Sequence, residues 1–123
     1  MMATTTPFVF AVLLLFLAAQ GNCQCHSGTD FFITQAPTGQ TIKNKPEWTV
    51  TIKNDCSCSR DNIQVYVEGF HSVEEVDPSK LSKITDTNYL LNNGNVVRGY
   101  DSVSFNYAWS RVEFSVTTSS VYC

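Results

Sequence analysis

The segment Trp48-Thr49-Val50-Thr51-Ile52-Lys53 indicates the fold class, because large apolar side chains alternate with polar ones at every second position. Successive side chains of a β-strand point to opposite faces, so this pattern turns one face to a core and the other to solvent. The same alternation occurs in residues 63–68, 103–107 and 112–116, and shorter strands are expected at residues 30–35, 88–91 and 96–97. The sequence therefore predicts an all-β domain, an antiparallel β-sandwich of about seven to eight short strands.

Residues that favour turns separate these segments. Asn93-Gly94 lies between Leu91 and Val96, where two residues that tolerate positive φ would close a β-hairpin. The stretch Asp77-Pro78-Ser79-Lys80-Leu81 is the helical candidate, because Asp can cap a helix and Pro is accepted at its first position. We expect one short helical turn there. Other turns are expected at Pro37-Thr38-Gly39, Lys45-Pro46 and Arg98-Gly99.

Residues 1–23 are expected to be a secretory signal peptide, because residues 8–19 form an unbroken run of apolar or small residues followed by a short polar stretch. The run is shorter than the ~20 residues that a membrane helix needs, so no membrane insertion is expected after its removal. Cleavage between Cys23 and Gln24 would leave four cysteines, whereas cleavage after Gly21 would leave five. The even number favours the first site and a secreted domain of residues 24–123.

The four cysteines of that domain, Cys25, Cys56, Cys58 and Cys123, are expected to form disulfides that staple the fold. Cys56 and Cys58 are too close along the chain to bond each other easily, so their partners are Cys25 and Cys123. Either assignment of these partners is compatible with the sequence. No metal site is expected, because a zinc ribbon requires Cys-x-x-Cys pairs, and no cofactor is expected either.

The charge of the chain argues against two classes of partner. The formal net charge is −3, and the eight Lys and Arg residues form no basic stripe. Binding to nucleic acid or to a membrane surface is therefore not expected.

An enzymatic function is also not expected. The two histidines, His26 and His71, are isolated from any nucleophile motif. Glu74, Glu75 and Asp77 form an acidic cluster next to a predicted turn, where neighbouring carboxylates repel one another into solvent instead of facing each other across a cleft.

Several motifs occur in the order found in a known plant family. They are Cys25, residues 30–35, 46–58, 69–72, 77–78, 90–94, 103–108 and 115–116, and Cys123. In these motifs the chain resembles the Tapetum Determinant family, small secreted proteins whose best-known member is a ligand of a leucine-rich-repeat receptor kinase and specifies cell fate in the anther. The resemblance implies a signalling protein of the apoplast that binds such a receptor ectodomain. It also places the contact surface between Gly69 and Tyr89, with Phe70 and His71 as candidate contacts and Phe70 as an exposed anchor.

The chain departs from this family at two positions. Family members typically carry six cysteines, and two of these positions are Glu68 and Tyr89 here. The paired loss suggests that the two cysteines bond each other in relatives. Glu68 and Tyr89 are therefore expected to lie close together on neighbouring strands.

A second resemblance leads to an alternative function. Ile33-Thr34-Gln35, residues 48–54 and residues 102–107 look like the carbohydrate-binding sandwich of some plant endoglucanases, which implies binding of a cell-wall polysaccharide by stacking of aromatic rings. Trp48 and Tyr107 alternate in phase with apolar neighbours and are expected in the core. The exposed candidates for partner binding are Tyr66, Tyr100 and Trp109.

Overall fold

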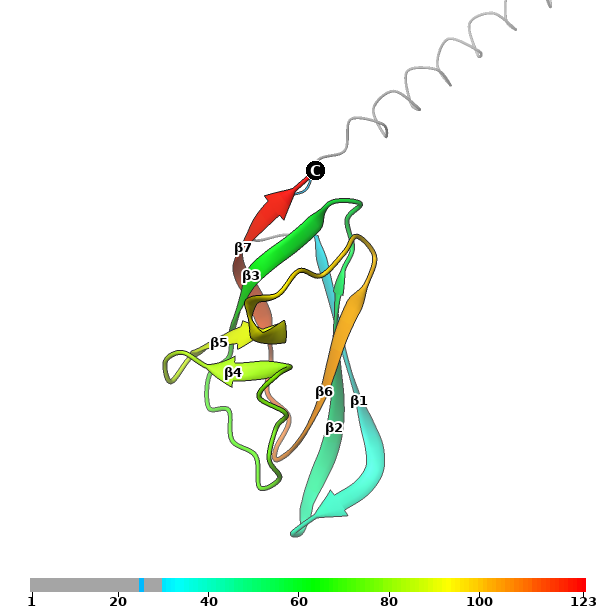
Figure 1. Cartoon of the computed structure of the whole chain (residues 1–123). Coiled ribbons are helices and arrows are strands. Elements are labelled where there is room, and N and C mark those ends of the chain that lie inside the picture. The colour runs from blue at the N-terminus through cyan, green and yellow to red at the C-terminus, as the bar shows by residue number, and fades with distance from the viewer. Residues whose placement is uncertain (1–24, 26–29) are drawn as a thin grey trace, which may run out of the picture.

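The computed structural model describes Cys25 and residues 30–123, and these form two antiparallel sheets that face each other (Figure 1). This confirms the predicted all-β sandwich. The sheet named A here contains three strands in the order β1-β2-β6, and the sheet named B contains four in the order β4-β5-β3-β7. The strands are β1 (Phe31–Ile42), β2 (Lys45–Asn54), β3 (Ser59–Tyr66), β4 (Leu81–Lys83), β5 (Asn88–Leu91), β6 (Ser102–Ala108) and β7 (Ser115–Tyr122).

Sheet A follows the alternation in the sequence. Strand β2 lies at its centre and pairs Val50 with Phe105 and Ile52 with Val103 of β6. These four side chains are buried between the sheets, together with Tyr107. The residues between them, such as Thr51 and Ser104, point away from sheet B because side chains of a strand alternate between its faces.

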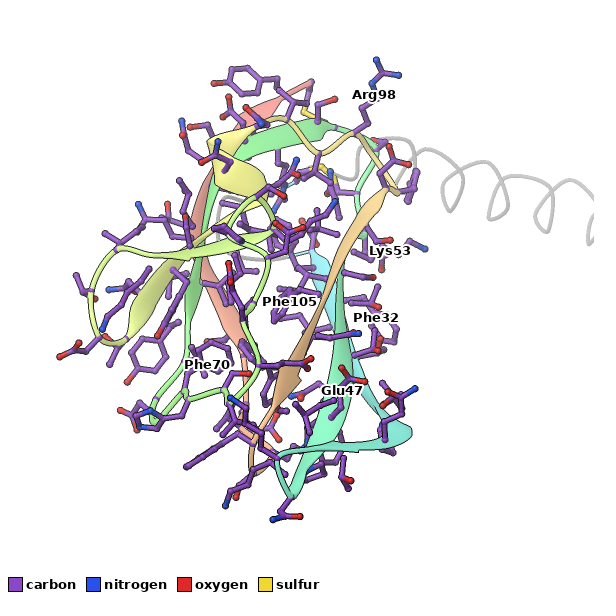
Figure 2. The ribbon with its side chains drawn as sticks, turned by 60° about the horizontal axis from the view of Figure 1, so that its bottom comes forward. Phe32, Glu47, Lys53, Phe70, Arg98 and Phe105 are labelled. Carbon is purple, nitrogen blue, oxygen red and sulfur yellow. A yellow bond between two sulfur atoms is a disulfide. The ribbon has the colours of Figure 1, made fainter. Side chains whose placement is uncertain are left out.

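Sheet B supplies the other half of the core. Its strand β3 buries Ile63 and Val65, and Val67 just after the strand is also buried. Leu81, Tyr89 and Leu91 close the core from the short strands β4 and β5. Figure 2 shows Phe105 and Phe70 between the two sheets, whereas Phe32 and Lys53 project from the far side of sheet A. The expectation that Tyr107 is a core residue is confirmed, and Trp48 is half-buried against the same core.

Two predicted turns have a different structure. The hairpin expected at Asn93-Gly94 is a short 3-10 helix, η1 (Asn92–Gly94), and Val97 then bridges to Arg60 of β3 instead of pairing back on β5. Conversely, the helical candidate at residues 77–81 is a hydrogen-bonded turn that leads directly into β4. Asp77 stabilises this turn, because its carboxylate accepts bonds from the backbone N–H and the hydroxyl of Ser79.

Cys25 and Cys123, the first and last residues that the structure describes, are held at one end of the sandwich. Two disulfides, Cys25–Cys56 and Cys58–Cys123, join both terminal segments to the turn between β2 and β3. None of the helical segments in the described part of the chain is long and apolar enough to span a bilayer. The expected signal peptide and its cleavage site at Cys23 and Gln24 lie outside the described residues.

Candidate partner-binding surface

Phe70, expected to be an exposed anchor, packs against the core instead. Its ring makes edge-on contacts with Tyr89, Tyr107 and Phe114 at centroid distances of 5.3, 5.3 and 5.5 Å. The prediction of a free side chain is therefore wrong. Phe70 lies outside a strand, so its environment could not be deduced from strand periodicity, and the positive φ of Gly69 turns the chain so that the ring points inward.

His71, Trp109 and Tyr66 each have a partner within the protein. The rings of His71 and Trp109 lie 5.5 Å apart, and Lys45 places its ammonium 4.5 Å from the centre of the Trp109 ring. Tyr66 is half-buried on β3 and donates its hydroxyl to Glu68, which raises the pKa of Tyr66. The structure thus brings His71 and Trp109 together, while Tyr66 pairs with a different group.

Glu68 and Tyr89 are not the cross-strand pair that was expected. The register pairs Tyr89 with Val65 and Asn88 with Tyr66, so Glu68 lies beyond the end of this ladder. Glu68 is exposed whereas Tyr89 is buried, so the two side chains point to different environments. The expectation that a bridge would form between these positions is therefore not supported.

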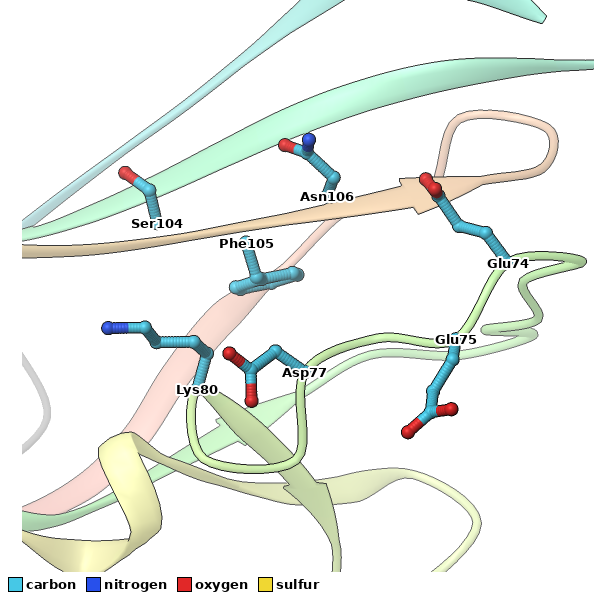
Figure 3. A pocket seen from close by; sticks show the side chains of 7 residues that line it. All are labelled: Glu74, Glu75, Asp77, Lys80, Ser104, Phe105 and Asn106. Atoms are coloured by element: carbon cyan, nitrogen blue, oxygen red, sulfur yellow. The ribbon is translucent and has the colours of Figure 1, made fainter. Parts of the chain in front are cut away.

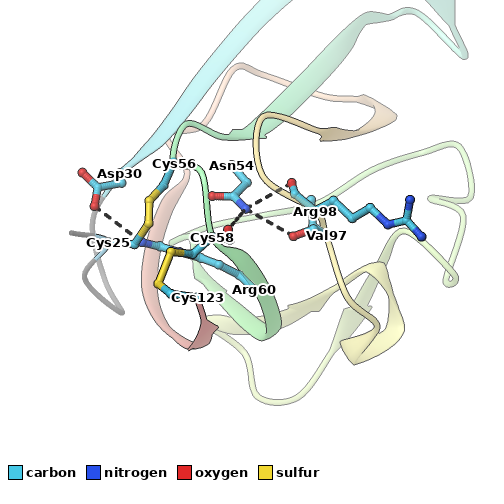
Figure 4. Close-up of polar contacts among 9 residues, drawn as sticks. All are labelled: Cys25, Asp30, Asn54, Cys56, Cys58, Arg60, Val97, Arg98 and Cys123. Carbon is cyan, nitrogen blue, oxygen red and sulfur yellow. Dashed lines mark hydrogen bonds and ion pairs between the residues drawn. A yellow bond between two sulfur atoms is a disulfide. The ribbon is translucent and has the colours of Figure 1, made fainter. Parts of the chain in front are cut away.

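The disulfides enclose one end of the sandwich. All four cysteines predicted to pair do so, and the pairing left open by the sequence is Cys25 with Cys56 and Cys58 with Cys123 (Figure 4). Sulfur atoms of Cys25, Cys56 and Cys58 lie within 4.8 Å of one another. Because each of these sulfurs is used in a disulfide, this group does not offer the thiolates that a metal ion would require.

Asn54, at the end of β2, ties a second loop to this end. The Asn54 side chain is fully buried, and its amide donates to three carbonyl oxygens, those of Cys58, Val97 and Arg98 (Figure 4). Its backbone N–H donates to the carbonyl of Asp101 at 2.8 Å. One asparagine therefore fixes the segment between η1 and β6 to the disulfide-bonded turn.

Gly99 lets the same loop approach the turn closely. A Cβ at this position would lie 2.4 Å from the carbonyl oxygen of Ser57 and 2.8 Å from that of Cys56. These atoms belong to the backbone and cannot move aside easily, so only glycine fits. The loop is consequently held in one arrangement by packing as well as by hydrogen bonds.

Tyr100 is the residue that this rigid loop presents to solvent. Its backbone has φ of +67°, and its N–H donates to the carbonyl of Asn54 at 2.8 Å. A left-handed conformation costs an ordinary residue roughly 1 kcal/mol, and glycine would adopt it without that cost. The Tyr100 side chain is nevertheless 60% exposed, so the fold itself does not require it.

Phe32 and Lys53 extend the exposed surface from Tyr100 across sheet A. Phe32 is 58% exposed and lies opposite Lys53 in the register of β1 and β2. The Lys53 ammonium lies 5.9 Å from the centre of the Tyr100 ring and 3.9 Å from a carboxylate oxygen of Asp55. We call Phe32, Lys53 and Tyr100 the aromatic patch. It combines two exposed rings with a cation, and exposed aromatic rings are enriched among the anchors of protein interfaces.

The rest of the outer face of sheet A is rich in hydroxyl and amide groups. Thr51 shares a hydrogen bond of 2.9 Å with Ser104, and Thr49 donates to the side chain of Asn106 at 2.8 Å.

Of the two rings in the aromatic patch, Tyr100 was predicted from the sequence to be exposed, and Phe32 was not. The signal was present in the sequence, because Phe32 is out of phase with its apolar neighbours Phe31 and Ile33.

Glu74 of the acidic cluster is half-buried and pairs with Glu47, a buried glutamate outside the cluster. Glu47 on β2 is only 8% exposed and accepts a hydrogen bond of 2.8 Å from Thr38. Glu74 faces it, and burial together with the hydrogen bond and the charge of Glu47 raises the pKa of Glu74. This pair joins the segment after β3 to sheet A and thereby has a structural role.

Comparisons with known proteins agree with the sequence motifs. The family model described as "Tapetum determinant 1, C-terminal" matches residues 27–123, which is most of the chain. Searches of the curated proteins and of the solved structures returned no match. The match covers both sheets and three of the four paired cysteines, because it begins after Cys25. The chain therefore belongs to the Tapetum determinant 1 family, and this membership supports a role in plant signalling in general.

Proposed function

We propose that this protein is a ligand of a leucine-rich-repeat receptor kinase in plant cell-fate specification, and that it binds the receptor ectodomain through the aromatic patch. Family membership supports a signalling role in general. Phe32 and Lys53 of the patch project from the face of sheet A that sheet B does not cover (Figure 2), and Tyr100 is exposed on the loop before β6, so a partner can reach the patch without rearrangement of the core.

The conformation of Tyr100 is the observation that carries the proposal. The left-handed backbone of Tyr100 costs conformational free energy. Nothing within the fold requires an aromatic side chain at this exposed position. Asn54 and Gly99 fix the loop before any partner arrives, so little conformational entropy would be lost on binding. An interface anchor meets both conditions, because it must be exposed and already in position.

The test replaces Tyr100 by glycine, which suits the backbone and removes the ring. Tyr100→Gly should weaken binding to the cognate receptor ectodomain by about tenfold or more, as expected of a hot-spot residue, in a titration against a panel of such ectodomains. The free energy of unfolding should change by less than about 1 kcal/mol, because relief of strain offsets the greater freedom of the unfolded chain. Phe32→Thr should also weaken binding while preserving β1.

Ile84→Thr provides the matched control, because Ile84 is 49% exposed and lies on the turn after β4, away from the patch. It should bind like the unchanged protein. Undiminished receptor binding by Tyr100→Gly would disprove the patch as the docking surface.

A second candidate function is binding of a cell-wall polysaccharide. It is favoured by the two exposed rings beside a row of hydroxyl and amide groups, a combination that can stack on and hydrogen-bond to sugars. Trp109 is a weaker candidate than the sequence suggested, because Lys45 and His71 already contact its ring. Retention on cellulose or xyloglucan that is lost in Tyr100→Gly, without any receptor binding, would establish this function in place of the first.

A further inference from the structure

The outer edge of β6 is the feature that leads to a further function. Strand β6 pairs with β2 on one side only and forms the margin of sheet A. The N–H of Asn54 donates to the carbonyl of Asp101, and that of Trp109 to the carbonyl of Pro46. Odd-numbered residues of this segment therefore direct their backbone groups to β2, and even-numbered residues direct theirs to the free edge.

Only the last even-numbered residue of this edge has a partner among the described residues. The N–H of Ala108 donates to the hydroxyl of Ser72 at 2.9 Å, and its carbonyl accepts a bond of 3.0 Å from the N–H of Val73. In the described part of the chain, no other backbone segment bonds to Ser102, Ser104 or Asn106 from this side. These three residues thus present a row of N–H and C=O groups with the spacing of a strand.

Two adjoining hollows run along this edge. One, of about 370 Å³, is lined by Ser104, Phe105 and Asn106 of β6 and by the turn that contains Glu74, Glu75 and Asp77. The other, of about 280 Å³, continues past Ser102 and Val103. Lys80 lines both hollows, so together they form one groove. Figure 3 shows Phe105 directed toward the side of Asp77 and Lys80, and Ser104 and Asn106 directed to the other side.

The other sheet edges carry features that oppose pairing with a further strand. Strand β1 contains Pro37 and an irregular register between Pro37 and Thr41. Strand β4 has three residues and ends in the charged Lys83, and β7 pairs with β3 through two register shifts. The stretch from Ser102 to Asn106 has no proline, glycine or charge. Proteins commonly protect exposed edges by such features. Among the edge strands that the structure describes, β6 is the one without a proline, a charge or a register shift.

We propose that this groove binds an extended peptide segment with basic side chains, which adds to β6 as a fourth strand of sheet A. The backbone groups of Ser102, Ser104 and Asn106 would supply the hydrogen bonds. Alternate side chains of the added strand would point to the same side as Phe105, toward Glu75 and Asp77. The two hollows together are lined by twice as many acidic as basic residues, so the groove favours basic over acidic segments. The acidic residues are Glu74, Glu75, Asp77 and Asp101, and the basic ones are Lys80 and Arg98.

The test uses the oxidised secreted chain, with backbone amides observed by NMR, and two blocked synthetic peptides of sequence KVKVK and EVEVE. The KVKVK peptide should cause saturable changes in the chemical shifts of the backbone amides of Ser102, Ser104 and Asn106, and should slow their hydrogen exchange. The EVEVE peptide should bind about tenfold more weakly. Equal binding of both peptides, or shifts confined to other surfaces, would overturn the proposal. The result does not depend on receptor binding, since the peptides are titrated against the protein alone.

Two variants separate the edge from the charge. Ser104→Pro removes an N–H that faces the groove and leaves the bonds to β2 intact, so it should abolish binding of KVKVK. If this variant does not fold, the charge variant Glu75→Lys still tests the proposal, because it should weaken binding of KVKVK by about threefold. Its control is Glu68→Lys, a charge reversal at an exposed glutamate outside the groove, which should leave binding unchanged. Equal effects of the two reversals would contradict the proposed site. Sedimentation that shows dimers with protected amides at Ser104 and Asn106 would assign the edge to a second copy of the chain and overturn the peptide proposal.

Discussion

Phe70 shows how a residue outside the strands can still belong to the core. The segment after β3 leaves sheet B, and its aromatic ring returns to fill the space between Tyr89, Tyr107 and Phe114. Aromatic pairs in such edge-on arrangements contribute more than the burial of their surface alone. The residue that the family resemblance offers as a contact is therefore a packing residue first.

Phe70→Ala should accordingly destabilise the fold by about 2–4 kcal/mol, because it leaves a cavity among three aromatic rings. The change in the free energy of unfolding can be measured by urea denaturation. His71→Ala, the neighbouring exposed position, serves as a control and should cost less than about 1 kcal/mol. A stable Phe70→Ala protein that has lost receptor binding would restore Phe70 as a direct contact.

Glu74 gives the fold a dependence on pH. The pKa of Glu74 is raised above its ordinary value of 4.5 by burial and by Glu47. Its protonated form is therefore favoured in the folded state, so its contribution to stability is complete below the pKa of the unfolded chain. That contribution is lost as the pH rises through the higher folded pKa.

Glu74→Gln, which stays neutral and can still donate to Glu47, should remove this loss. The melting temperature of the variant at pH 7 should exceed that of the unchanged protein by up to ~4 °C, and the difference should vanish near pH 4. Melting curves across this range provide the measurement. A variant that is less stable at neutral pH would mean that the Glu74 carboxylate is ionised and satisfied in the fold.

At the scale of elements, alternation predicted the strands that have one buried and one exposed face. The buried residues of β2 and β6 are those of the alternating pattern. The pattern failed at the margins of the sheets. The apolar residues Val112 and Phe114 led to a predicted strand at residues 112–116. The strand in the structure, β7, begins only at Ser115 and runs through a largely polar segment.

The candidate site was less accessible to sequence reasoning, for a related reason. Tyr100 depends on Asn54, which lies far away in the sequence and acts through hydrogen bonds that leave no periodic signal. Likewise, the Asn-Gly pair at residues 93–94 satisfied the rule for a hairpin turn. The bridge between Val97 and Arg60 shows that the chain continues along β3 on the same side as β5 instead of turning back, so tertiary contacts override that local preference.

For the molecule as a whole, both disulfides restrain the unfolded chain. Cys58–Cys123 closes a loop of 65 residues and Cys25–Cys56 one of 31. In the chain-entropy model these loops correspond to about 4.3 and 3.7 kcal/mol, and measured effects are often smaller.

Replacing Cys58 and Cys123 together by alanine should therefore destabilise the protein by about 2–4 kcal/mol, and slightly more than replacing Cys25 and Cys56. Urea denaturation of both double variants at the same pH gives the comparison. A clearly larger loss for the shorter loop would show that native contacts around Cys25 and Cys56, and not chain entropy, dominate.

The position of the disulfides also determines how the protein can be handled. Both terminal segments are bonded to the turn after β2, and the loop that carries Tyr100 is tied to the same turn by Asn54 (Figure 4). An affinity tag, a fluorescent protein or an attachment to a sensor surface joined directly before Cys25 or after Cys123 would thus stand close to the aromatic patch. The turn of Lys43 and Asn44 between β1 and β2 lies at the opposite end of the sandwich (Figure 1). A label placed there would leave the patch and both disulfides open, and a receptor that ignores a terminally tagged ligand could still recognise the same ligand labelled at this turn.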